Sequence, residues 1–164
     1  MDTLTDEVER ALTAELYYLA VVFALTLPDI CAALESADGE TAGWKYQAWC
    51  DTWLIPSYPE LNSRDLWSMR CGVVHQGRLG HPNLQYARIL FTIPNRQQNV
   101  FHRNIANGAL NLDVIIFCRD VSRAVEQWYI AKQSDLNVVA NLPNLVQYRA
   151  QGLAPYMVGM PLIA

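Results

Sequence analysis

The sequence lacks most of the short motifs that identify an enzyme directly. It has no glycine-rich phosphate loop, no nucleophile elbow and no pair of carboxylates at a catalytic spacing. It is also poor in cysteine, and its four cysteines include no Cys-x-x-Cys pair. Three of the four lie among apolar or aromatic neighbours, where a free thiol packs as a small hydrophobic group. We therefore expect no disulfide.

Ligands at the spacing of a metal site are missing as well. A zinc site would have to combine Cys71, His75, His81 or His102, and their spacing matches none of the usual zinc patterns. The sequence thus predicts no metal and no other cofactor.

Signals for a membrane are not found in the sequence either. The most apolar stretch, residues 16–28, is flanked by Glu15 and Asp29 and is shorter than the roughly 20 residues that cross a bilayer. The first residues are acidic, whereas a secretory signal begins with positive charge. We expect a cytoplasmic protein without a membrane span.

The sequence does contain enough apolar residues for a packed core. Of its 164 residues, 52% are hydrophobic and 17% are charged, which is typical of a folded globule. At this length we expect one domain over residues 1–164. Apolar periodicity predicts a mainly α fold, a helical bundle with one small β-hairpin.

Two helices are predicted in the N-terminal region. Apolar positions recur at helical intervals over residues 3–25, and Thr3 or Thr5 is available as an N-cap. Because Pro28 cannot continue a helix but can begin one, residues 28–36 read as a second, short helix. A bend is expected at residues 26–28.

Two further helices are predicted before residue 80. Residues 41–54 carry three tryptophans on one side of a third helix, so this face is either buried or paired with another chain. Asn62 or Ser63 can cap a fourth helix, which ends near Gly77.

The second half of the chain begins with a different pattern. Branched and aromatic residues at 87–93, followed by the apolar pair 100–101, predict a small β-hairpin near residues 86–103. Helical periodicity returns over residues 111–132. Residues 134–164 should form an irregular extension, apart from a short helix near 142–149.

Charge is segregated along the chain. Residues 61–104 contain six arginines and one acid, and residues 1–60 contain eleven acids and two cations. An arginine-rich segment suits phosphate, because guanidinium binds phosphate oxygens with two parallel hydrogen bonds. RNA or a nucleotide is therefore a candidate partner. The alternative is that this segment docks on the acidic first helix.

Arg70 and His75 form the motif that best suits chemistry. This Arg-x4-His spacing on a helix of an α-rich domain resembles the signature of the HEPN superfamily, many of whose members are metal-independent ribonucleases. Residues 66–78 and 109–113 also resemble an uncharacterised group of bacterial HEPN-like proteins. The resemblance implies a homodimer in which two such motifs face each other and the RNA 2′-hydroxyl attacks the neighbouring phosphate.

The two side chains have suitable chemistry for that reaction. His75 can exchange a proton near neutral pH, and Arg70 can stabilise charge on the phosphate. Five helical residues turn through about 500°, however, which places them roughly 140° apart around the axis. They can meet at one phosphate only if His75 lies in the last turn or if a second protomer contributes.

Other residues near the motif are candidates for substrate binding. They are Arg64, Cys71, Gln76, Arg78 and His81.

Simpler roles remain open for the same residues. Arg70 can form an ion pair, for instance with Asp65 or an acid of the first helix, while His75 caps carbonyls. Asp29 and Asp113 lie near expected helix starts, where carboxylates commonly act as caps. The chain would then be a non-catalytic nucleotide- or protein-binding module, or a structural dimer.

Overall fold

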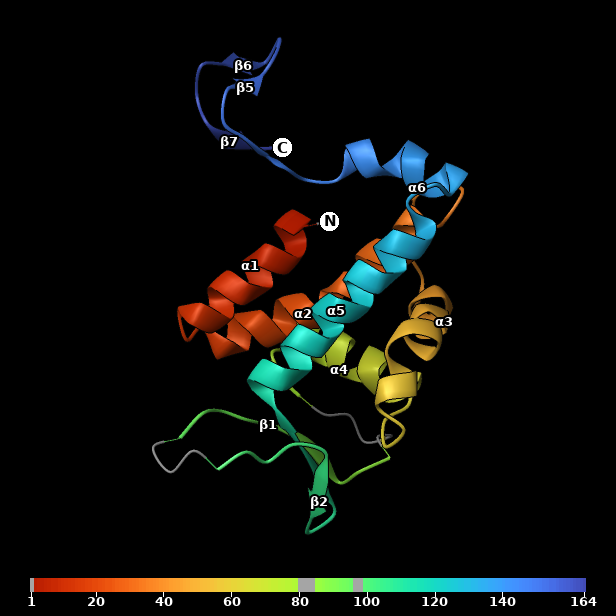
Figure 1. Ribbon diagram of the computed structural model, residues 1–164, viewed down its shortest axis with the longest axis vertical. Coiled ribbons are helices and arrows are strands. Elements are labelled where there is room, and N and C mark those ends of the chain that lie inside the picture. The colour runs from red at the N-terminus through yellow and green to blue at the C-terminus, as the bar shows by residue number, and fades with distance from the viewer. Residues whose placement is uncertain (1, 80–84, 96–98) are drawn as a thin grey trace.

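The computed structural model describes residues 2–79, 85–95 and 99–164, and these are mainly helical, as predicted (Figure 1). The helices are α1 (Asp2–Thr13), α2 (Tyr17–Leu34), α3 (Gly43–Trp53), α4 (Ser63–Gln76), α5 (Val114–Lys132) and α6 (Leu136–Asn141), with 3₁₀ turns η1 (Ile55–Ser57) and η2 (Leu142–Asn144). The strands are β1 (Arg88–Thr92), β2 (Asn104–Ala106), β3 (Ala109–Asp113), β4 (Tyr148–Arg149), β5 (Gly152–Leu153), β6 (Met157–Val158) and β7 (Leu162–Ile163).

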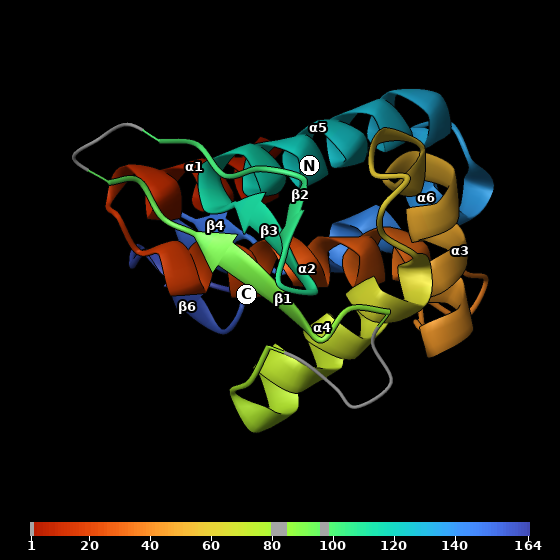
Figure 2. The same cartoon turned by 90° about the horizontal axis from the view of Figure 1, so that it is seen from below.

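Helix α2 is the centre of the bundle. It packs against α1, α3, α4 and α5, and ten of its 18 residues are buried (Figures 1 and 2). Within the described residues it is the one helix long and apolar enough to cross a membrane by length and composition, a test that core helices of soluble proteins also pass. The apolar stretch is therefore longer than expected, and in this fold it forms the core.

The predicted bend at residues 26–28 is wrong. Pro28 lies inside α2, and the chain breaks instead near Glu15, whose φ of 57° is left-handed. An interior proline costs about 3 kcal/mol, and burial of α2 on both sides of Pro28 offsets this cost. Helix α1 begins at Asp2, so neither Thr3 nor Thr5 precedes it as an N-cap.

Helix α3 matches the expected third helix, but its tryptophans differ in environment. Trp49 is only 4% exposed, whereas Trp44 is 69% exposed. One part of this face is therefore buried and another part faces solvent.

Helix α4 has the ends that were predicted. Asn62 Oδ1 accepts a hydrogen bond from the Asp65 backbone N–H at 2.8 Å, and Gly77 closes the helix with a φ of 62°. The chain then turns back so closely that the Arg78 N–H donates to the Gly72 carbonyl at 3.1 Å. Residues 74–78 at this turn are exposed, whereas Gly72 and Val73 just before them are buried.

The predicted β-hairpin is wrong in its partners. Strand β3 is the middle strand: β1 pairs with it in parallel and β2 pairs with it in antiparallel orientation (Figure 2). The true hairpin joins β2 to β3 through Asn107 and Gly108, both with positive φ, as expected of an Asn-Gly turn. Residues 111–113, predicted as the start of the following helix, belong to β3 because their apolar positions fit both periods.

The C-terminal region also differs from expectation. The short helix predicted near residues 142–149 is wrong in position: α6 ends at Asn141, and only the single turn η2, Leu142–Asn144, lies in the predicted range. Residues 145–164 are not irregular throughout, since β4 pairs with β7 and β5 pairs with β6.

Gly72→Ala should lower the free energy of unfolding by about 2 kcal/mol, because a Cβ at this position would lie 2.5 Å from the Arg78 carbonyl oxygen. Urea denaturation measures the change. Val74→Ala, at an exposed position of the same helix, should change it by less than about 0.5 kcal/mol. Equal or higher stability of Gly72→Ala would show that the turn is not constrained.

Candidate functional site

Arg70 and His75 meet at the C-terminal end of α4. Arg70 Nη1 lies 3.2 Å from His75 Nε2, and the His75 side chain is exposed to solvent. A guanidinium can only donate hydrogen bonds, so in this contact Nε2 accepts and the proton of the neutral ring is on Nδ1. The separation of about 140° around the axis is bridged by the long arginine side chain near the helix end.

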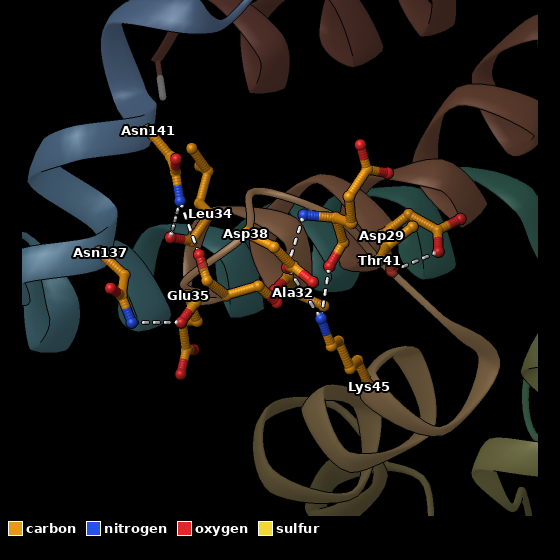
Figure 3. A network of polar contacts seen from close by, with 11 residues as sticks. Asp29, Ala32, Leu34, Glu35, Asp38, Thr41, Lys45, Asn137 and Asn141 are labelled. Carbon is orange, nitrogen blue, oxygen red and sulfur yellow. Dashed lines mark hydrogen bonds and ion pairs between the residues drawn. The ribbon is translucent and has the colours of Figure 1, made fainter.

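Asp29 provides a countercharge for Arg70. The Arg70 Nε pairs with Asp29 Oδ2, and the two side chains are 18% and 7% exposed. The other oxygen of Asp29 accepts from the Thr41 hydroxyl at 3.1 Å, a contact drawn in Figure 3. Asp29 was expected to cap a helix. It is instead an interior residue of α2, where it orients the guanidinium of Arg70.

Trp67 covers the guanidinium from another side. Its ring centre lies 5.3 Å from Arg70 Cζ, which is within the range of a cation–π contact. The Trp67 ring also lies against Tyr46, at 5.1 Å between centroids. Arg70 is thus held between a buried carboxylate and an aromatic ring, and its orientation is fixed before any ligand arrives.

The alternative roles considered for this motif are only partly correct. Arg70 does form an ion pair, but its partner is Asp29, whereas Asp65 accepts hydrogen bonds from Asn62 and from the Gln85 backbone N–H. Within the described residues, the hydrogen-bond partner of the His75 side chain is Arg70 Nη1 and not a backbone carbonyl.

Only some of the other predicted site residues lie near Arg70 and His75. Cys71 is half-buried beside Arg70, and Gln76 and Arg78 are exposed just beyond His75. Arg64 is exposed near the start of α4, about 9 Å along the helix axis from Arg70. His81 lies outside the described residues.

The basic segment does not dock on α1 through the arginine contacts seen here. Arg103 pairs with Glu60, with Nη2 and Oε2 at 3.0 Å, and Arg70 pairs with Asp29 of α2. Among the described residues, the arginine that forms an ion pair with α1 from another element is Arg119, which lies outside the basic segment and pairs with Glu9.

A second cluster of titratable groups was not predicted. The Tyr58 hydroxyl donates to Asp120 Oδ2 at 2.7 Å and lies 3.5 Å from His102 Nε2. His102 Nδ1 accepts from the Asp113 backbone N–H at 3.1 Å. Tyr58 directly follows η1, His102 precedes β2, Asp113 ends β3 and Asp120 lies in α5, so no spacing in the sequence connects them.

Burial sets the titration of this cluster. It raises the pKa of Tyr58, and the hydrogen bond to Asp120 raises it further. Burial lowers the pKa of His102, although Asp120 and Asp113 act in the opposite direction. Since Tyr58 is almost fully buried, this cluster joins three elements of the fold and is less suited than His75 to contact a large substrate.

Comparisons with known proteins found no match. No family model, no curated protein and no solved structure is similar to this chain. In the described part of the chain, no three His, Cys, Asp or Glu side chains come together as a metal site.

Asp29→Asn should lower the free energy of unfolding by about 3 kcal/mol, because it leaves the largely buried Arg70 without a countercharge. Combining Asp29→Asn with Arg70→Met should restore most of the loss, since both charges are then absent, and Arg70→Met alone completes the cycle. Urea denaturation of the single and double variants measures this coupling. Additive effects of the two changes would contradict the ion pair.

The stability of the protein should decline as pH falls below about 6.5, in part because His102 is harder to protonate when folded than when unfolded. His102→Asn should weaken this dependence, since Asn Oδ1 can accept the Asp113 N–H without titrating. Thermal unfolding of both proteins between pH 5 and pH 8 tests it. Parallel curves would exclude His102 as a source of the dependence.

Proposed function

We propose that this chain is a metal-independent endoribonuclease of HEPN type, cytoplasmic and active as a homodimer. The observation that carries the proposal is the 3.2 Å contact between Arg70 Nη1 and an exposed His75 Nε2. A fixed cation beside an accessible imidazole is the minimum that phosphate transesterification requires. The resemblance of the motif to HEPN ribonucleases points to the same reaction.

Each residue has a defined part in the proposed reaction. On RNA binding, Arg70 Nη1 exchanges its contact with His75 Nε2 for a phosphate oxygen, which frees the Nε2 lone pair. His75 Nε2 then removes the proton from the RNA 2′-hydroxyl, whose oxygen forms a bond to the adjacent phosphorus. Arg70 donates to the phosphate oxygens as negative charge builds up on them. The bond from phosphorus to the 5′-oxygen breaks, and a protonated His75 of the partner subunit gives that oxygen its proton. The products are a 2′,3′-cyclic phosphate and a 5′-hydroxyl.

Asp29 and Trp67 act as positioning residues in this scheme. Their contacts use the Nε and one face of the guanidinium, which leaves Nη1 directed toward His75. Gln76 and Arg78 are exposed beyond His75, where they can contact the RNA backbone on either side of the cleaved bond.

Cleavage of fluorescent RNAs in excess chelator tests the proposal. His75→Asn should reduce the rate by about 100-fold or more, because it removes the proton acceptor. Since His75 is exposed, this variant should fold normally, whereas Arg70 variants must first be checked for stability. Arg88→Ala, an exposed arginine elsewhere in the basic segment, is the matched control and should retain most activity.

Absence of cleavage by folded wild-type protein would reject the proposed ribonuclease activity. A second candidate, a non-catalytic nucleotide- or protein-binding module, would then be favoured by the low exposure of the Arg70 side chain, which is 18%. Cleavage that persists in His75→Asn would instead place the active site elsewhere.

A further inference from the structure

The C-terminal arm, residues 145–164, leaves the helical bundle and folds back on itself. Strand β4 pairs with β7, and the backbones of Gln147 and Ala164 exchange two hydrogen bonds of 2.8 and 3.0 Å. Figure 1 shows the arm projecting at the end of the molecule opposite the three-stranded sheet. The end of the chain is therefore ordered as a closed ribbon.

The helix from which the arm starts is fixed to the bundle. The Asn137 amide donates to the Glu35 carbonyl at 3.0 Å, and the Asn141 amide donates to the carbonyls of Leu34 and Ser36 at 3.2 and 2.8 Å. These contacts hold α6 against the C-terminal end of α2 (Figure 3). The arm thus starts from a defined position.

The surface of the arm is unusually apolar. Its one charged side chain is Arg149. Large apolar side chains are exposed along the arm, among them Tyr148 (64%), Tyr156 (83%), Met157 (49%), Val158 (71%), Met160 (59%) and Ile163 (75%). Isolated two-stranded ribbons are at best marginally stable in water. An ordered ribbon with such exposed apolar side chains is suited to pack against the surface of another protein.

A cavity of about 570 Å³ lies between the C-terminal end of α2, α3 and the end of α5. Its walls include Trp44, Trp49 and Trp53. The charged groups at the cavity neutralise one another, because Lys45 pairs with Asp38 at 3.2 Å (Figure 3) and Lys132 pairs with Glu35 at 3.3 Å. This tryptophan cavity offers apolar contact without unmatched charge.

The arm and the tryptophan cavity lie on different sides of one molecule. In both views α3 is on one side of the bundle and the arm is on the other (Figures 1 and 2). The arm therefore does not reach the cavity of its own chain in this structure, which leaves that cavity open to the arm of another chain.

We propose that the arm binds a second copy of this chain, with Tyr156, Met157 and Met160 seated in the tryptophan cavity of that copy. Methionine sulfur makes favourable contacts with aromatic rings, and Trp44 is exposed at the cavity to receive them. The charge balance of the two surfaces matches, whereas the acidic N-terminal region and the basic segment would gain no ion pair from an arm with one charge. This interface is separate from the Arg70 and His75 centre.

Sedimentation velocity of the full-length protein between 5 and 200 μM tests the interface. Wild type should self-associate. The arm variant is Tyr156→Asp/Met157→Asp, and the cavity variant is Trp44→Asp. Each should need a concentration at least ten-fold higher than wild type to self-associate. Tyr18→Asp, which changes an exposed aromatic residue on α2 outside both surfaces, should behave as wild type.

Mixing the two variants decides which surfaces meet. The arm variant retains an intact cavity and the cavity variant retains an intact arm, so the mixture should form a one-to-one complex that neither variant forms alone. Monomeric wild type at 200 μM, or a mixture that does not associate, would overturn the proposal. A mixture that does not associate counts against this interface alone, whereas monomeric wild type would also contradict the proposed homodimer. RNA cleavage is measured separately and is not decided by either result.

Discussion

The buried carboxylate of Asp29 is the constraint on which the candidate site depends. It lies inside the central helix, where an ionised group is costly unless it is paired, and Arg70 of α4 provides the pair. Thr41, before α3, satisfies its second oxygen. One charged group in the core therefore fixes three parts of the bundle relative to one another and aims the guanidinium at the surface.

This arrangement explains how a mostly covered arginine can still belong to a reactive centre. The guanidinium is planar and carries five donors in a fixed geometry. The contact of its Nε with Asp29 and the contact of its face with the Trp67 ring therefore set the direction of the remaining donors. His75 needs no such support, because it lies in the last turn of α4, which Gly77 ends and the close return of Arg78 to Gly72 secures.

The sequence predicts well those elements whose ends are set by local chemistry. Asn62 and Gly77 bound α4 as expected, because a cap and a left-handed glycine act within a few residues. The two errors with most consequence involve distant partners. Pro28 continues a helix because the core buries both flanks, and β1 pairs with β3 across about 20 residues. Neither the core nor that partner is visible in a local pattern.

The contacts of the candidate site fall into the same two groups, those set by local spacing and those set by distant partners. The contacts of Arg70 with His75 and with Trp67 follow from spacing within α4. Asp29 and the cluster of Tyr58, His102 and Asp120 come together only through tertiary packing. Arg70 was expected to pair with Asp65 or with an acid of the first helix, whereas its partner is Asp29, in the middle of α2.

Strand β3 and helix α5 meet at Asp113 without a connecting loop. The residue ends the strand, caps the helix through Ile115 and Ile116, and donates its own N–H to His102. No linker therefore separates the sheet from α5, so the direction of the helix is set directly by the last residue of the strand. The same helix ends where Trp128 and Lys132 contact Glu35 at the end of α2, so one continuous segment ties the sheet to the opposite end of the central helix.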